Sequence, residues 1–222
     1  MACKICIVLC RWLKCPQLDA QRFEDASKEW ERNNTKDWDL YASDSDDVRA
    51  MNGRAAKIAK VDPSAALAVY KQAAAAGSAW SMMQVGHRYE LGRGTSQDLV
   101  QAELCYRRAA EAGLPSAILL LAGLLFRNRT SDEWMDLLGA AARSDVILAN
   151  YYLATYCYER NPSARTARKV RPLLEAGSDA GYPRAKLLLS RWRATGKLGF
   201  GEMRAGYRDY LSIQEEFGAK TN

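Results

Sequence analysis

Cysteine is the residue type whose spacing most suggests chemistry. Four of the six cysteines lie near the N-terminus, at Cys3, Cys6, Cys10 and Cys15. Four thiolates can hold a zinc ion or an iron–sulfur cluster. The residues between them are mostly apolar, whereas metal-binding knuckles carry polar turns with glycine. We therefore favour a short amphipathic helix that docks on the body or on a partner, and we expect no metal and no cofactor.

Acid–base and phosphate chemistry have little support in the sequence. His87 is the single histidine, which excludes a multi-histidine metal site and removes the usual catalytic base. The segment Gly92-Arg93-Gly94 has the glycines of a phosphate-binding loop but not the preceding strand or the Lys-Ser/Thr ending, so we interpret it as a turn between helices. Nucleophile-elbow, dinucleotide-binding and zinc-protease motifs are absent from the sequence. The chain is predicted not to be an enzyme and to have no small-molecule substrate.

Charge is unevenly distributed along the chain. Residues 16–47 carry ten acidic and four basic side chains, whereas residues 163–222 carry twelve basic and six acidic ones. Opposite charges at the two ends suit either separate partner surfaces or self-complementation, and the simpler interpretation, which we prefer, is that they are solvated helix faces. One hypothesis is that the acidic segment 19–47 folds back onto the basic end and regulates access to it.

The basic end contains a cluster of bases on two successive helices, with Arg165, Arg168, Lys169 and Arg171 at the start of the first and Arg184, Lys186, Arg191 and Arg193 on the second. Helical spacing places Arg165 and Lys169 on one side of a helix. Such a cluster suits an acidic protein partner, and the alternative is a nucleic acid or another anionic surface. Binding of single strands also requires aromatic side chains among the bases, and Trp192 is the one aromatic residue inside the basic cluster. We therefore favour a protein partner.

Apolar stretches are too short for a membrane span. The longest runs from Pro115 to Phe126 and ends at Arg127, well below the roughly 18–20 residues that a bilayer requires. The apolar run before Arg11 lacks a following cleavage site, so a secretory signal is not expected either. A cytoplasmic location is the favoured expectation.

A repeat of about 36 residues runs through the centre of the chain. Shifting the sequence by this period aligns Asp62 with Asp98, Ala66 with Ala102, Tyr70 with Tyr106, Ala73-Ala74 with Ala109-Ala110, and Gly77 with Gly113. Weaker copies follow over residues 132–160 and 166–196. Variation in length is confined to the loop that contains Asn128, as expected of a structural repeat.

Each repeat unit is expected to contain two helices. Asp98 can cap a first helix that runs to about Ala112, and Gly113 supplies a left-handed stop. Pro115 begins the second helix, where its missing N–H costs nothing. One such pair cannot bury its apolar face alone, so neighbouring pairs must stack.

At these residues the sequence resembles the Sel-one-like repeats, which belong with the tetratricopeptide-like helical solenoids. The signature positions are Val85-Gly86, Tyr89, Gly92-Arg93-Gly94, Asp98, Ala102, Tyr106, Ala109-Ala110 and Gly113. The resemblance extends over about residues 62–196 and implies an all-α, right-handed solenoid of about four antiparallel helix pairs. It also implies a scaffold or adaptor that binds other proteins without catalysis.

Three regions are expected: a Cys-rich and acidic extension over residues 1–47, the solenoid over residues 48–196, and a C-terminal capping helix over residues 197–222. Trp30 and Trp38 are possible anchors of the extension, and Pro172 is expected to kink or divide its helix. The partner-binding positions that we predict are Lys71, Glu103, Arg107, Arg165, Arg168, Lys169 and Arg204.

Overall fold

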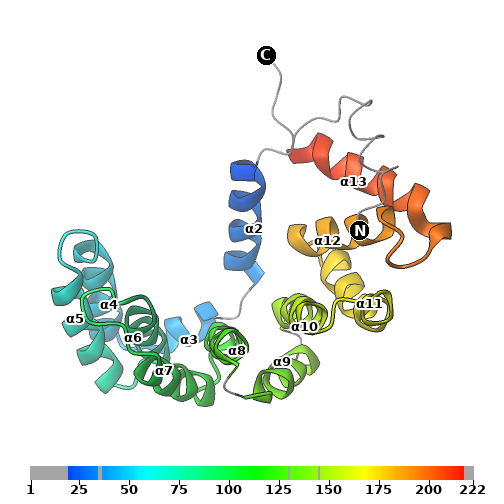
Figure 1. The fold of residues 1–222 in the computed structure, drawn as a ribbon. Coiled ribbons are helices and arrows are strands. Elements are labelled where there is room, and N and C mark those ends of the chain that lie inside the picture. The colour runs from blue at the N-terminus through cyan, green and yellow to red at the C-terminus, as the bar shows by residue number, and fades with distance from the viewer. Residues whose placement is uncertain (1–19, 35–36, 130, 145, 218–222) are drawn as a thin grey trace. The chain divides into compact units, whose positions relative to one another are not determined.

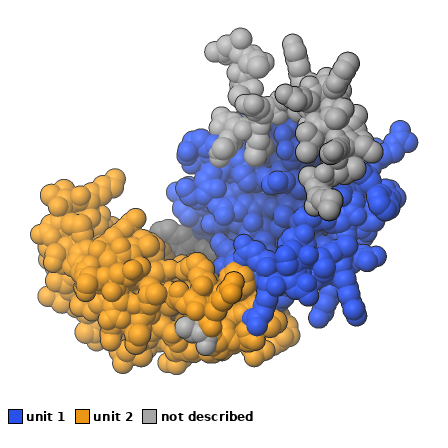
Figure 2. All heavy atoms as spheres, viewed as in Figure 1, with its two compact units in different colours: residues 1–34, 147–222 blue, residues 35–146 orange. Residues whose placement is uncertain are grey.

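The structure is a computed structural model that describes residues 20–34, 37–129, 131–144 and 146–217. All regular secondary structure within these ranges is helical, which confirms the all-α prediction (Figure 1). The chain divides into unit 1, which comprises residues 1–34 and 147–222, and unit 2, which comprises residues 35–146 (Figure 2). The N-terminal cysteines and the helix predicted for them lie outside the described residues.

Unit 2 consists of helices that pack on their neighbours in sequence order, α4 on α5, α5 on α6, and so on to α9. Its helices are α3 (Asp37–Ser43), α4 (Asp46–Ile58), α5 (Pro63–Ala75), α6 (Ala79–Leu91), α7 (Leu99–Glu111), α8 (Pro115–Asn128) and α9 (Glu133–Arg143). This order of packing is that of stacked helix pairs, as the repeat predicts.

The ends of these helices follow the local signals in the sequence. The Asp98 carboxylate accepts hydrogen bonds from the Val100 and Gln101 amides at 3.1 and 3.0 Å, and so caps α7. Gly113 has a φ of 87°, which an L side chain rarely adopts, and Pro115 occupies the first turn of α8. Ser45 caps α4 through the Val48 amide, and Asp46 and Asp47 lie in the first turn of that helix.

The repeated small and aromatic residues form the core of unit 2. Ala66, Ala102 and Ala109 are completely buried, and Tyr70 is 5% exposed. Tyr106 is also completely buried, and its hydroxyl donates to Glu90 at 2.7 Å. Alanines allow close helix contacts, and the tyrosines fill the space beside them. Tyr70 and Tyr106 are therefore core residues of unit 2.

Unit 1 contains the last helices of the chain together with one helix from the N-terminal extension. They are α2 (Ala20–Asn34), α10 (Ile147–Arg160), α11 (Ala164–Asp179), α12 (Pro183–Ala194), a 3-10 turn (Phe200–Glu202) and α13 (Met203–Phe217). Its core includes Leu174, Leu189 and Trp192. Trp192 is 3% exposed and packs on Tyr158, with 4.5 Å between the ring centroids.

One prediction for the C-terminal half needs correction. Helix α11 runs through Pro172 without a break, so the helix is not divided there, and a kink at Pro172 stays a prediction. Pro172 is exposed, and the surrounding turns of the helix are anchored by buried Val170 and Leu174. The capping helix α13 packs on α12 as expected, and its buried residues are Gly206, Ile213 and Gln214.

The extension is more ordered than its polar composition suggests. Residues 20–34 form α2 in unit 1, and residues 37–43 form α3 in unit 2. Asp37 in α3 is buried, and it accepts hydrogen bonds from the amide and the hydroxyl of Ser116 at the start of α8. The three regions drawn from the sequence remain a prediction.

Candidate protein-interaction surfaces

The first candidate surface is the basic row of α11, by which we mean Arg165, Arg168 and Lys169. All three are exposed, and within the described residues none of them forms an ion pair with a carboxylate. Their spacing places them within one stripe of the helix. Pro172 and Ala176 continue that stripe and are also exposed. The row therefore presents three fixed positive charges beside a small apolar area.

Two other arginines of unit 1, Arg171 and Arg193, are paired with carboxylates of the same unit. Arg171 lies 2.7 Å from Glu175 and 2.6 Å from Glu202. Arg193 lies 3.2 Å from each of these two glutamates and 3.4 Å from Asp209. This network joins α11, α12 and α13, so its charges contribute to packing rather than to a partner surface.

Arg184 at the start of α12 is paired with the acidic extension. It lies 2.6 Å from Glu24 and 4.0 Å from Glu31, both on α2. The acidic segment thus does contact the basic end, as hypothesised, at Arg184.

The contact of α2 involves residues that the sequence analysis did not single out. Phe23 and Ser27 are buried, and Trp30 is half-buried beside Tyr182 with a centroid distance of 4.8 Å. Only Trp30 was expected to be an anchor. The i, i+4, i+7 spacing of the three residues is the signal of an amphipathic helix and could have identified this face. The side chain of Trp38, the other expected anchor, is not described.

The remaining predicted positions differ in their surroundings. Lys71 is exposed, with its Nζ atom 5.0 Å above the centre of the Tyr89 ring. Glu103 and Arg107 are half-buried. The Arg107 guanidinium donates two hydrogen bonds of 2.7 Å, one to each carboxylate oxygen of Glu133. This bond holds the pKa of Glu133 below its usual value. Arg107 therefore links α7 to α9, which leaves Lys71 the more accessible of the candidates in unit 2.

Arg204 is exposed near the start of α13 in unit 1. It belongs to the same unit as the basic row of α11, whereas Lys71, Glu103 and Arg107 belong to unit 2. The predicted positions are therefore not a single site within either unit.

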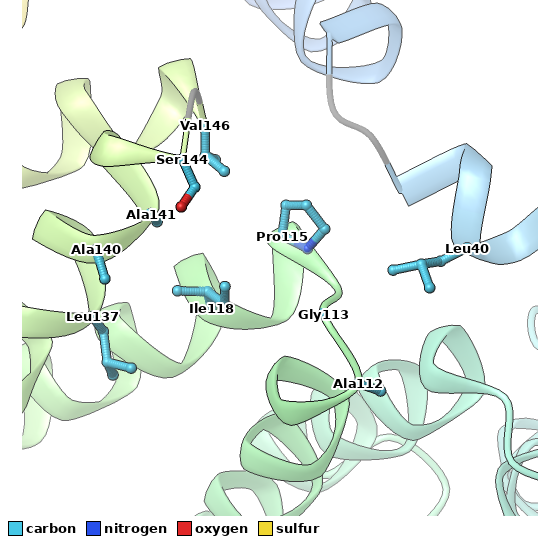
Figure 3. Close-up of a pocket in the computed structure, with 10 residues that line it drawn as sticks. All are labelled: Leu40, Ala112, Gly113, Pro115, Ile118, Leu137, Ala140, Ala141, Ser144 and Val146. Atoms are coloured by element: carbon cyan, nitrogen blue, oxygen red, sulfur yellow. The ribbon is translucent and has the colours of Figure 1, made fainter.

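A pocket of about 590 Å³ lies in unit 2 between the α7–α8 turn, α9 and Leu40 of α3 (Figure 3). The lining side chains are apolar or small, and Ser144 supplies a hydroxyl. None of the residues drawn in Figure 3 carries a charge or a titratable side chain. The pocket has the chemistry to accept an apolar side chain, but it has no group for acid–base work.

The described histidine and cysteines are poorly suited to catalysis. Burial lowers the pKa of His87, with Arg93 and Arg88 acting in the same direction, so the imidazole is neutral near pH 7. Burial also raises the pKa of the Cys105 and Cys157 thiols, which keeps them in the weakly nucleophilic protonated form. Among the residues that the structure describes, no group of three or more His, Cys, Asp or Glu side chains is arranged to hold a metal ion.

The segment Gly92-Arg93-Gly94 is a turn between α6 and α7, as interpreted from the sequence. Gly92 ends α6 with a φ of 65°. Gly94 has a φ of 79°, and a Cβ atom there would collide with the backbone of Pro63 and Ser64. Gly92 therefore allows α6 to end in a left-handed conformation, and Gly94 allows two chain segments to approach each other closely.

Solved structures with this fold include two helical repeat proteins. The Sel1 repeat protein from Oxalobacter formigenes matches with a TM-score of 0.60 and 19% identity, over 86% of this chain and 87% of that one. A protective antigen of uropathogenic Escherichia coli with an SLR fold matches with a TM-score of 0.60 and 15% identity, over 79% of this chain. The match spans 43% of the antigen.

These likenesses show that the chain has the Sel1-repeat (SLR) fold, in agreement with the resemblance found in the sequence. No protein-family model matches the sequence, and no curated protein matches it. In the parts of the chain that the structure describes, every helix is too short or too polar to cross a bilayer.

Proposed function

We propose that this chain, which has the fold of Sel1 repeat proteins, is a non-catalytic adaptor that binds an acidic segment of a protein partner through the basic row of α11. The observation that carries the proposal is the contrast between this row and its neighbours. Arg171, Arg184 and Arg193 are paired with carboxylates of unit 1, whereas the row faces solvent. Exposed charges of one sign steer an oppositely charged partner and set its register.

The burial of Trp192 favours a protein over a nucleic acid. Single-stranded nucleic acids bind by stacking bases on exposed aromatic rings among the basic residues. Trp192 is 3% exposed, and α11 contains no aromatic residue. The basic cluster therefore lacks a stacking platform, and electrostatic attraction alone gives binding that is weak and strongly dependent on salt.

A pull-down from native lysate tests the proposal, using the full chain and a variant with Arg165, Arg168 and Lys169 changed to Glu. The matched control changes Lys186, Arg191 and Arg208 to Glu, which alters the net charge equally at exposed positions of the same unit. We expect a discrete protein that survives nuclease treatment, is lost with the first variant and is kept with the control. Recovery of nucleic acid alone, lost in high salt, would instead support the anionic-surface alternative.

Lys71, Glu103, Arg107 and Arg204 remain further candidate contacts. Of these, Lys71 and Arg204 are exposed, so they are the first to substitute once a partner has been captured. Loss of the same partner on substitution of Lys71 would extend the binding surface to unit 2.

A further inference from the structure

Helix α2 covers a defined surface of unit 1, which we call the α2 seat. It consists of Ala180, Tyr182 and Arg184 around the start of α12, and Phe217 at the end of α13. The Trp30 indole N–H donates to the Ala180 carbonyl at 3.2 Å, and the Tyr182 hydroxyl donates to Glu31 at 2.6 Å. Phe23 meets Phe217 edge to face, with ring centroids 5.4 Å apart.

The residues of α2 that meet the seat form one stripe of the helix. Phe23, Ser27, Trp30 and Glu31 follow an i, i+4, i+7, i+8 spacing, and Glu24 lies beside Phe23 to reach Arg184. Ser27 is completely buried, and its hydroxyl is satisfied by the Phe23 carbonyl, so this position accepts only a small side chain. Such a stripe is the pattern by which an amphipathic helix binds a surface of another protein.

The interactions that keep α2 docked on the α2 seat are of modest strength. Arg184 and Glu24 are 29% and 39% exposed, and ion pairs with such exposure contribute little net stability. The opposite side of α2 is polar and exposed, including Asp25, Lys28 and Glu29. A helix of 15 residues is marginally stable on its own in water, so α2 depends on a few side-chain contacts to remain docked.

We infer that the α2 seat is a binding site for an acidic amphipathic helix of a protein partner, and that α2 occupies it in the absence of that partner. The partner helix carries an aromatic residue at position i and an acidic residue at i+1. A small residue follows at i+4, an aromatic residue at i+7 and an acidic residue at i+8. The charge of Arg184 and the hydroxyl of Tyr182 select the acids. This surface is distinct from the basic row of α11, so the inference does not rest on the proposed function.

An intramolecular occupant lowers the apparent affinity for a partner in proportion to the time for which the seat is covered. The test uses the full chain and a fluorescent peptide of residues 20–34 as probe. Changing Phe23 and Trp30 to Ala in the chain removes contacts of α2 while leaving the seat intact. We expect this opened chain to bind the probe at least about tenfold more tightly than the unchanged chain.

Changes in the chain and in the peptide report on specificity. In the opened chain, Arg184→Glu is expected to abolish binding of the probe, and a peptide with Glu24 and Glu31 changed to Arg is expected to restore it. A peptide with Glu29→Lys is the control, because Glu29 is exposed on α2. A designed peptide that keeps only Phe23, Glu24, Ser27, Trp30 and Glu31 tests whether the stripe is sufficient.

Hydrogen exchange on the unchanged chain keeps the test decisive if the opened chain does not fold. We expect the amides of α2 to exchange faster than those of α12, and an excess of peptide to accelerate exchange in α2 alone. Equal protection of the two helices, with no effect of the peptide, would overturn the inference. A dimer that dissociates on addition of peptide would identify α2 of a second copy as the occupant, and would overturn the assignment to a separate partner.

Discussion

The contact between α6 and α7 at Gly86 allows a sharp test of the helical-repeat packing. A Cβ atom at position 86 would lie 2.9 Å from both Cδ1 and Cε1 of the Tyr106 ring and 3.1 Å from the Cβ atom of Cys105. Carbon atoms prefer separations of about 3.5–4.0 Å. The ring cannot easily move away, because it is completely buried and its hydroxyl is bonded to Glu90.

Gly86→Ala is therefore expected to destabilise unit 2. Overpacking of a core by one methyl group costs about 1–3 kcal/mol. The higher helix propensity of alanine returns about 1 kcal/mol. Because the obstructing group is a fixed ring, we place the overpacking cost near the upper end, which leaves a net loss of about 1–2 kcal/mol.

Gly53→Ala is the matched control in the same unit. Gly53 is exposed inside α4, and a Cβ atom there would meet nothing within 4 Å. The same substitution is expected to stabilise unit 2 by about 0.5–1 kcal/mol. The two variants therefore differ in sign, although each adds one methyl group to a helix.

Urea unfolding followed by far-UV circular dichroism measures both effects, with an unchanged m value showing that the unfolded state is comparable. A third variant, Tyr106→Leu, removes the ring, and in that background the cost of Gly86→Ala is expected to fall by about 1 kcal/mol or more. A stabilising Gly86→Ala, or an equal cost with and without the ring, would refute the close-packing explanation.

Two further predictions concern unit 1. Burial raises the pKa of Tyr152 to about 12, so the stability that the neutral phenol provides is complete below pH 10 and is lost as the pH rises towards 12. Tyr152→Phe is expected to reduce the fall in the free energy of unfolding between pH 9 and pH 11, and an undiminished fall would contradict this. Pro172→Ala restores a backbone donor to the Arg168 carbonyl in an exposed stretch of α11, so it is expected to raise the free energy of unfolding by about 1–2 kcal/mol in urea unfolding. No gain would mean that α11 is already adapted to the proline.

Much of the repeat could be predicted because its signals are local. Asp98 caps the helix that follows it, Gly113 adopts a left-handed conformation, and Pro115 opens the next helix. Capping and backbone sterics act over a few residues and depend little on the rest of the chain. The buried alanines follow in the same way, since a close helix contact requires a small side chain wherever it occurs in the repeat.

The candidate surfaces could be predicted only in part. The sequence placed Arg165 and Lys169 on one side of a helix and Arg168 in the same basic cluster, and all three are exposed in the structure. The sequence could not indicate that Arg184, in the same basic segment, is paired with Glu24. Charge alone gave no distinction between these arginines.

The amino-acid sequence by itself determined the helices of the clearest repeat units and the residues at which they begin and end, because each of these depends on interactions between near neighbours in the chain. The tertiary structure alone decided which side chains meet across long separations. Glu24 and Arg184 are joined by a hydrogen bond although 160 positions separate them, and Tyr182 reaches Glu31 over 151. Many other acids and bases could have formed such pairs, and the choice among them follows from the packing of α2 on α12 and α13.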